Sequence, residues 1–314
     1  MKTQRKKPKL VSVVVPSFNE EGNIRNLFNR IMKNFKSNEY LVEVIFVNDG
    51  STDGTLDQIK VLSKEFKSVK YISFSRNFGH QKALKAGLDY SNGDAVISLD
   101  ADLQHPPELI ADMIKLWEKG YEVVYTIRKD IDTTPIFKRF TAVLFYKILN
   151  KLSGLNISQG AADFRLLDRK VVKVIREMQE ENLFIRGMIP WLGFNQISLE
   201  YEPEERVWGT SKYTIKKMFL FALQGITSFS VKPLHLTTYL GALIFLLSSF
   251  YICYALFIYF VQNKSIPGWT SMLISVLFLG SLNLLMLGVL GEYIGKIMIE
   301  SKRRPQYIIK DKNL

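Results

Sequence analysis

Short apolar runs alternate with amphipathic segments through the first part of the chain, up to about residue 126. The apolar runs are rich in β-branched residues and are apolar on both faces, as buried parallel strands are. They cover residues 10–15, 41–47, 69–74, 95–99 and 122–126. Between them, apolar side chains recur at helical spacing within residues 20–34, 55–66, 81–90 and 107–119. This alternation predicts an open, mostly parallel α/β sheet with helices between its strands.

Two long uncharged runs follow in the C-terminal part of the chain. Residues 235–261 and 265–291 contain no Asp, Glu, Lys or Arg, and each run is 27 residues long. A helix needs about 20 apolar residues to cross the hydrocarbon core of a membrane. The alternative is a pair of buried core helices, but soluble helices of this length without a polar face are uncommon. We therefore expect a transmembrane hairpin with spans at residues 235–261 and 268–292.

Basic residues flank this hairpin on both sides, in a chain with a net charge of +12. The flanking residues are Lys212, Lys216, Lys217 and Lys232 before the first span and Lys296, Lys302, Arg303 and Arg304 after the second. The connecting loop contains Lys264 alone. By the positive-inside rule, the rest of the chain is cytoplasmic and the protein crosses the cell membrane twice. A nucleic-acid partner is disfavoured, because the basic residues cluster beside the spans rather than on a recognition element.

The hairpin leaves a basic N-terminal tail at residues 1–9, a domain at 10–232 and a basic cytoplasmic tail at 293–314. Within the domain, residues 136–152 and 213–231 have the character of amphipathic basic helices at a membrane surface. The alternative for residues 136–152 is a helix that packs on the sheet, and we favour the membrane surface. The single cysteine, Cys253, excludes an internal disulfide framework and a cysteine-ligated zinc site.

Polar residues follow each of the first four predicted strands, in segments 16–21, 48–54, 75–80 and 100–105. Open α/β sheets bind ligands at the carboxyl ends of their strands, so we expect these segments to form one site. The chain lacks a P-loop motif and has no Gly-x-Gly-x-x-Gly after its first strand, which argues against both of those nucleotide-binding folds. Asp49 is expected to hydrogen-bond a base or ribose. The alternative is that its segment is only a turn into the next helix.

Two carboxylates, Asp100 and Asp102, leave the fourth strand with a spacing that places both on one side of an extended segment. Gln104 adds a third oxygen at the same spacing. Hard oxygen ligands of this kind suit Mg²⁺ or Mn²⁺, which take substrate phosphates for their remaining positions. The alternative is an ordinary solvated turn. Because Asp49 follows the neighbouring strand, we favour a metal site.

Six ordered motifs make the resemblance to a known family specific. They are VPSFNEE at residues 15–21, VNDGSTDGT at 47–55, SRNFGH at 75–80, DADLQHPPE at 100–108, GAADFRL at 160–166 and RVWGTSKY at 206–213. With GEYIGK at 291–296, the chain resembles the family 2 glycosyltransferases of GT-A fold, over nearly its whole length. Within them it is most similar to the polyprenyl-phosphate glycosyltransferases, which include dolichyl-phosphate mannose synthases and bacterial bactoprenol glucosyltransferases. The resemblance implies a Rossmann-like domain with a C-terminal membrane hairpin.

The resemblance also implies a nucleotide-sugar donor and assigns residues to it. The donor would contact Pro16, Phe18, Glu20, Asp49, Asp100 and Arg128. Catalysis would depend on Asp163, Asp102 and Arg206. Phosphate groups of the donor and of a lipid acceptor would meet Arg206, Ser211 and Lys212, because Arg offers a two-point fork and Lys a point charge. The alternative for Arg206 is a surface salt bridge with Glu204 or Glu205.

The expected reaction is inverting transfer of a sugar to polyprenyl phosphate, such as undecaprenyl phosphate, at the cytoplasmic face of the membrane. The product would serve surface glycans or wall-polymer modification. An acceptor phosphate is mostly a dianion at pH 7, so it is already a nucleophile. Family habit favours UDP-glucose or another UDP-hexose as donor, and the sequence leaves the sugar open. The resemblance suggests a homotetramer, and the Lys-, Asn- and Ile-rich composition a bacterial source.

Two other functions are compatible with parts of the sequence. A processive polysaccharide synthase of the same superfamily would have a Gln-x-x-Arg-Trp motif and more membrane spans, and neither occurs here. A non-catalytic membrane scaffold or flippase partner would not need Asp100, Asp102, Asp163 and Arg206. The presence of these residues favours an enzyme.

Overall fold

The computed structural model describes residues 9–35, 39–129, 150, 154, 160–181, 183–202, 230–262 and 268–314. The expected membrane-surface helices at residues 136–152 and 213–231 lie almost wholly outside these residues, as do Arg206, Ser211 and Lys212. The chain forms two compact units. The first comprises Met1–Asn150, Leu155–Met218 and Arg304–Leu314, and the second comprises Lys151–Gly154 and Phe219–Arg303.

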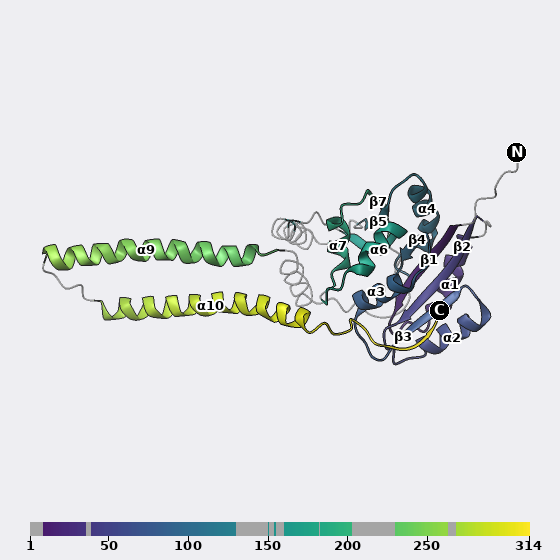
Figure 1. The fold of residues 1–314 in the computed structure, drawn as a ribbon, viewed down its shortest axis with the longest axis horizontal. Helices are drawn as coiled ribbons and strands as arrows, with labels where there is room; N and C mark the ends of the chain where they lie inside the picture. Colours follow the sequence, from purple (N-terminus) through teal and green to yellow (C-terminus); the bar gives the residue numbers. More distant parts are fainter. Residues whose placement is uncertain are drawn as a thin grey trace. The chain divides into compact units, whose positions relative to one another are not determined.

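The first unit is built on an eight-stranded sheet with strand order β7-β5-β6-β4-β1-β2-β3-β8 (Figure 1). The parallel strands at its centre are β1 (Lys9–Ser17), β2 (Tyr40–Asn48), β3 (Val69–Phe74) and β4 (Ala95–Ser98). β5 (Val123–Arg128) is parallel to β7 (Gln196–Tyr201), and β6 (Ala161–Asp168) lies antiparallel between β4 and β5. The five predicted strands and the α/β fold class are confirmed, within a sheet that is mixed.

Helices cover both faces of this sheet, because its central strands are apolar on both sides. Val11, Val13 and Val15 of β1 share one core cluster with α1 (Ile24–Lys33), α2 (Thr55–Glu65) and α4 (Ile110–Glu118). On the opposite face, α3 (His80–Tyr90) approaches β1 so closely that a Cβ on Gly87 would lie 2.0 Å from Val14 Cγ1. α6 (Arg169–Glu177) packs against α3. The four predicted helices are therefore present, the last beginning with a 3₁₀ turn at Pro107–Leu109.

The order of strand addition reverses after β3. β2 and β3 are added on one side of β1, whereas β4 is added on the other side. The carboxyl ends of β1 and β4 therefore flank a switch point of the kind at which open α/β sheets bind ligands. The polar segments that follow β1 and β4 therefore lie at this switch point.

The expected basic tail at residues 293–314 is not a tail. Helix α10 (Trp269–Ser301) continues past the expected end of the second span at residue 292. The chain then adds β8 (Ile309–Asn313) to the open edge of β3, in antiparallel register. The charged sequence of β8 did not indicate this pairing, because edge strands often carry charged side chains that face solvent and so lack an apolar pattern.

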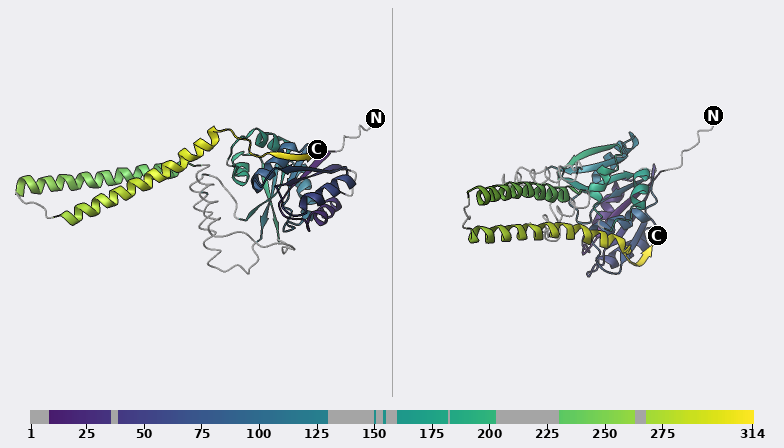
Figure 2. Two further views of the ribbon diagram at one scale, coloured as in Figure 1. Left: turned by 90° about the horizontal axis from the view of Figure 1, so that it is seen from below. Right: turned by 60° about the vertical axis from the view of Figure 1, so that its left-hand side comes forward.

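The second unit contains two long helices, α9 (Lys232–Gln262) and α10, which lie side by side and antiparallel (Figures 1 and 2). Near one end of the pair, the Tyr293 hydroxyl donates a hydrogen bond to the Ser230 carbonyl at 2.7 Å. Further along, a Cβ on Gly241 would lie 3.7 Å from Met286 Cε. The predicted hairpin is thus present as a structural element.

Among the described residues, one helix is long and apolar enough to cross a membrane, at Ser275–Ser301 with a mean hydropathy of 1.7. In α9 the apolar stretch among the described residues is shorter, at Thr237–Tyr251. Many apolar side chains of both helices are exposed in the isolated chain, among them Phe245, Phe250 and Leu284. The hairpin therefore indicates association with a membrane, while the number of crossings stays a prediction.

Candidate active site

Hydrogen bonds join the four polar segments that follow β1 to β4. The Asn19 amide donates to Ser51 Oγ at 3.0 Å, which ties the segment after β1 to the segment after β2. Asp49, in the segment after β2, accepts hydrogen bonds from the segment after β3. His80, at the end of the segment after β3, contacts Asp100 after β4. The four segments therefore lie together at one edge of the sheet, and their role as a ligand-binding site stays a prediction.

Asp49 is almost fully buried and uses both carboxylate oxygens on one backbone turn. Oδ1 accepts the Phe78 N–H at 2.7 Å, and Oδ2 accepts the Gly79 N–H at 3.0 Å. Burial raises the pKa of Asp49, and the two hydrogen bonds only partly offset that effect. Gly50 follows with a φ of +66°, and a Cβ there would lie 2.4 Å from the Arg76 carbonyl carbon. Asp49 and Gly50 together fix the position of residues 75–79.

The register of β4 and β6 explains why Asp100 and Asp163 come together. Ser98 of β4 is paired with Arg165 of β6 in antiparallel register. Asp100 lies two residues after Ser98, and Asp163 lies two residues before Arg165, so both lie at the same end of the sheet. The Ser98 hydroxyl also donates to the Asp163 carbonyl. The resemblance assigned Asp163 to catalysis, and the structure brings it to the same end of the sheet as Asp100 of the expected metal site.

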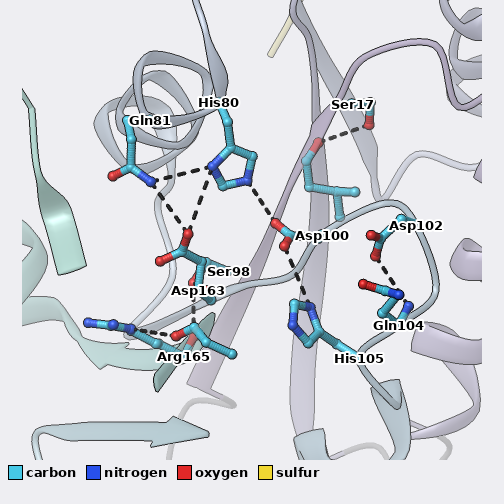
Figure 3. Close-up of polar contacts among 12 residues, drawn as sticks. Ser17, His80, Gln81, Ser98, Asp100, Asp102, Gln104, His105, Asp163 and Arg165 are labelled. Atoms are coloured by element: carbon cyan, nitrogen blue, oxygen red, sulfur yellow. Dashed lines mark hydrogen bonds and ion pairs between the residues drawn. The ribbon is translucent and has the colours of Figure 1, made fainter. Parts of the chain in front are cut away.

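His80 lies between these two acidic residues (Figure 3). Its Nε2 is 2.7 Å from Asp100 Oδ1, and its Nδ1 is 4.0 Å from Asp163 Oδ2. Burial opposes a charged imidazole, but Asp100 and Asp163 outweigh that effect and raise the pKa of His80 to about 9. Burial likewise opposes ionisation of Asp100, yet nearby His80 holds the pKa of this carboxyl well below its usual range. His80 therefore acts as a cation that separates two carboxylates.

Arg186 is the second cation of the site. It belongs to α7 (Ile185–Trp191) and meets Asp163 at two points, with Nη2–Oδ2 and Nε–Oδ1 distances of 3.1 and 3.3 Å. Gln81 links the same elements, because its Nε2 donates to Asp163 at 3.4 Å and its Oε1 accepts the Ile185 N–H. Although burial opposes it, Arg186 and His80 lower the pKa of Asp163. Asp163 is thus held as a carboxylate.

The segment that contains Asp102 is a turn, not the extended segment assumed from its sequence. Residues 101 and 102 form the turn, and Leu103 adopts a φ of +60°. Asp102 Oδ1 accepts the Gln104 N–H at 3.2 Å, while Asp100 faces His80 (Figure 3). The assumption was wrong because an alternating spacing indicates a shared side only where the backbone is extended.

The donor set at this turn fits a divalent cation that also binds a diphosphate. Two carboxylates and one amide supply hard oxygens, as Mg²⁺ and Mn²⁺ require. Within the described residues, no group of three His, Cys, Asp or Glu side chains is placed to hold a metal by itself. Asp102 and Gln104 would hold the ion, with Asp100 beside them.

Two buried aromatic side chains adjoin the turn. His105 Nδ1 is 3.7 Å from Asp100 Oδ2, and it has no hydrogen-bond partner among the residues that the structure describes. The Tyr201 ring lies edge-on to the His105 ring at 5.6 Å. Burial raises the pKa of Tyr201 to about 12, and Arg128, Asp100, Asp102 and Arg186 also act on it. Arg128, at the end of β5, therefore lies close enough to Tyr201 to act on it electrostatically.

The other candidate donor contacts occupy the end of β1. Pro16 is paired with Val47 in the parallel register of β1 and β2. Phe18 follows β1 and is 37% exposed. Glu20 accepts from Asn23 Nδ2 at 2.6 Å, and its own N–H donates to Thr55 Oγ1. The roles of these residues in binding a nucleotide stay predictions, and Arg206, Ser211 and Lys212 lie outside the described residues.

Sequence reasoning assigned no role to His80, Gln81, His105 or Arg186. His80 and His105 lie within the motifs SRNFGH and DADLQHPPE. Their positions after predicted strands could have indicated that they belong to the site. Arg186 had no such signal, because it lies in a short helix without a motif and reaches Asp163 only through the fold.

Comparison with known families supports both parts of the chain. A family model described as Glycosyl transferase family 2 matches residues 12–176. A second, described as GtrB C-terminal hairpin, matches residues 232–297. The first match spans the switch point, Asp49, Asp100 and Asp163, and the second spans most of α9 and α10.

Several curated proteins are similar over nearly their full length. The bactoprenol glucosyl transferase of Shigella phage SfV is 44% identical over 301 residues, which cover 96% of this chain and 98% of the relative. The prophage bactoprenol glucosyl transferase homolog of Escherichia coli (strain K12) is 42% identical over 300 residues, with the same coverage. The uncharacterized glycosyltransferase YkcC of Bacillus subtilis (strain 168) is 42% identical over 299 residues, or 95% of this chain and 93% of the relative.

Solved structures are more distant. Mannosyl-3-phosphoglycerate synthase from Rubrobacter xylanophilus has a TM-score of 0.48 and 16% identity, over 69% of this chain and 71% of that one. Glucosyl-3-phosphoglycerate synthase from Mycobacterium tuberculosis, in complex with Mn²⁺ and UDP-glucose, has a TM-score of 0.46 and 18% identity, over 70% and 77%. At these values, the ligands of the two structures say nothing about the ligands of this chain.

Proposed function

The chain belongs to glycosyl transferase family 2, and from this premise we propose that it transfers a hexose from a nucleotide-diphosphate sugar to a polyprenyl phosphate. The observation that carries the proposal is the extent of the similarity to named bactoprenol glucosyl transferases. The alignment has an overall identity of 44% and covers 96% of this chain, so it extends over the sheet, the site and the apolar hairpin. An acceptor with a long lipid chain accounts for a transferase domain that is continuous with a membrane hairpin.

The arrangement of Asp163 and Arg186 supports an acceptor that needs no base. A phosphate monoester is mostly a dianion at pH 7. A phosphate oxygen forms the new bond to the anomeric carbon, while the bond to the diphosphate breaks and the nucleoside diphosphate leaves with the electron pair. The anomeric configuration inverts, and no proton is transferred. Asp163 is a weak base, since Arg186 and His80 hold its pKa low.

In this reaction Asp163 orients Arg186, and Arg186 presents its guanidinium fork to a phosphate. His80 offsets the repulsion between Asp100 and Asp163, which keeps both carboxylates ionised beside anionic substrates. Arg128, Arg206, Ser211 and Lys212 are proposed as further phosphate contacts, on the grounds of their chemistry and of the resemblance.

A divalent cation, Mg²⁺ or Mn²⁺, would neutralise the leaving diphosphate when bound at Asp102 and Gln104 with Asp100 beside them. Pro16, Phe18, Glu20 and Asp49 are proposed to form the nucleoside end of the site. A UDP-hexose such as UDP-glucose is the donor that the bactoprenol glucosyl transferase names favour. The product would be a lipid-linked sugar for surface glycan or wall-polymer modification.

We further propose that both helices of the hairpin cross the cell membrane and that the sheet domain is cytoplasmic. The basic residues on both flanks of the hairpin support this orientation. A homotetramer is proposed with it. Gly288, Gly291 and Gly295 support close packing between copies, because a Cβ on any of them would meet nothing within 4 Å in the isolated chain.

The test is transfer of radiolabelled sugar from a panel of UDP- and GDP-sugars to undecaprenyl phosphate, in membranes that contain the full chain. One donor should give an organic-soluble product that is lost with EDTA and with Asp102→Ala. Asp112→Ala is the matched control, since Asp112 is exposed on α4, where it pairs with Lys115 of the same helix. Absence of product from every donor, with the protein folded and inserted, would contradict the proposal and favour a non-catalytic role.

A further inference from the structure

The segment that follows α10 returns to the sheet at its β3 edge. β8 pairs with β3, and the Ile308 carbonyl accepts the N–H of Ser75 at 3.0 Å. Ser75 begins the segment 75–79, whose other end is fixed by Asp49. Figure 2 shows this last stretch of the chain, in yellow, against the sheet. The returning segment therefore contacts the same segment that Asp49 holds.

Tyr307 joins this returning segment to the framework of the site. Its ring stacks on Phe74 with a centroid distance of 5.1 Å and an interplanar angle of 14°. Its hydroxyl donates to Asp89 Oδ2 at 2.9 Å. Phe74 is the last residue of β3, and Asp89 is near the end of α3. Tyr307 thus touches the elements on both sides of residues 75–79.

Aromatic contacts continue from Tyr307 into that segment. Phe74 meets the Phe78 ring edge-on at 5.6 Å, and the Arg76 guanidinium lies 4.2 Å above the Phe78 ring. The Phe78 N–H is the one that Asp49 Oδ1 accepts. A change at Tyr307 would therefore reach Asp49 through two ring contacts and one hydrogen bond.

The same contacts bear on α3. This helix begins directly after Gly79, and its first two residues are His80 and Gln81, which contact Asp100 and Asp163. The bond from Tyr307 to Asp89 ties the far end of α3 to the returning segment. Phe74 itself is buried, so its ring cannot take an alternative position without a cost in packing.

We propose that Tyr307 is a positioning residue for the nucleotide-diphosphate end of the site, acting through Phe74 and residues 75–79. The inference rests on the proposed function, since it assumes that this end of the site binds a nucleotide. It adds a consequence for the hairpin: residues 302–308 join α10 directly to the segment that shapes the donor site. The chain that follows the membrane helices is then part of the catalytic framework.

The experiment measures UDP affinity, with Mn²⁺ present, by calorimetry on the full-length protein in detergent, together with thermal unfolding. Tyr307→Phe keeps the ring stack and loses the bond to Asp89, and should weaken UDP binding about threefold to fivefold. Tyr307→Ala loses both contacts and should weaken it about tenfold or more. In steady-state assays the KM for the nucleotide sugar should rise, while the KM for the lipid phosphate stays unchanged.

Asp311→Asn is the matched control, because Asp311 anchors β8 through Lys60 and Tyr71 without touching residues 75–79. It should lower Tm while UDP affinity stays at the wild-type value. The inference is overturned if both Tyr307 variants bind UDP like the wild type, whatever their Tm. If the folded wild-type protein binds neither UDP nor GDP, the proposed function fails as well, which is a different result.

Discussion

Arg186 holds the carboxylate of Asp163 at two points, although 23 residues separate them in the chain. The pair joins α7 to β6 at the end of the sheet where Asp100 also lies. A guanidinium fixed in this way is oriented before any substrate arrives, so the binding of an anionic acceptor costs less conformational entropy.

Arg186→Lys keeps the positive charge and removes the two-point fork. We expect the KM for polyprenyl phosphate to rise about tenfold, because a point charge loses at least one directed hydrogen bond to phosphate. UDP affinity should not change. Arg169→Lys, at the start of α6, is the control. An equal loss of UDP affinity in Arg186→Lys would place Arg186 at the donor phosphates instead.

Asp163→Asn removes the charge that orients Arg186 while it keeps one acceptor oxygen. We expect kcat to fall about 100-fold or more, with unchanged UDP affinity. The pH profile separates orientation from base catalysis. The acceptor becomes a dianion as pH rises through about 6, so kcat/KM should increase through that range in wild type and variant alike. An acid limb that disappears in Asp163→Asn would show that Asp163 removes a proton.

Asp102→Asn tests the metal site without emptying the turn. The amide still accepts a hydrogen bond but binds a divalent cation more weakly than a carboxylate does. The Mn²⁺ concentration that gives half-maximal transfer should rise about tenfold, and EDTA should abolish transfer by the wild type. Asp112→Asn should behave as the wild type. A metal requirement that is identical in all three proteins would remove Asp102 from the ligand set.

Glu43 gives a prediction for stability. Its side chain is 5% exposed and accepts from Lys70 at 2.7 Å, from Asn92 N–H at 2.7 Å and from Ser12. Burial alone would raise the pKa of Glu43, but these hydrogen bonds outweigh burial and lower the pKa below its ordinary value of 4.5. A lowered folded-state pKa means that the ionised form stabilises the fold above about pH 4.5 and that this contribution is lost as pH falls through the folded-state value.

Glu43→Gln should therefore lower the free energy of unfolding by about 2–3 kcal/mol at pH 7. The difference in Tm between wild type and variant should stay constant from pH 6 to 8, and shrink as pH falls below about 4.5. Glu65→Gln is the control, because Glu65 pairs with Arg25 on the surface and such pairs contribute little. A pH-independent difference would mean that packing, not charge, stabilises this position.

The central strands could be predicted because their signal is local. β1 to β4 are short β-branched runs that alternate with helices, whereas the switch in strand order at β1 and β4 is set by the fold. β6, β7 and β8 carry weaker patterns, and their places depend on partners far along the chain, as when Asp311 of β8 pairs with Ser73 of β3. Nothing in the residues 309–313 themselves indicates that pairing.

The same distinction applies to the candidate site. Asp49, Asp100 and Asp102 could be placed because each lies within three residues of the end of a predicted strand. Arg186 could not, since only the fold brings α7 to β6. The side on which Asp100 and Asp102 project was also beyond local reasoning, because the φ of +60° at Leu103 belongs to a turn that the spacing did not reveal.

Because β8 follows the hairpin in the chain, it is synthesised after the other strands of the sheet. The ribosome produces β1 to β7 first, then both helices of the hairpin, and only then the strand that covers β3. Until that moment β3 presents an unpaired edge, which is a site of aggregation for newly made chains. Completion of the sheet during biosynthesis therefore waits for synthesis of the hairpin, so that the domain and its anchor mature together.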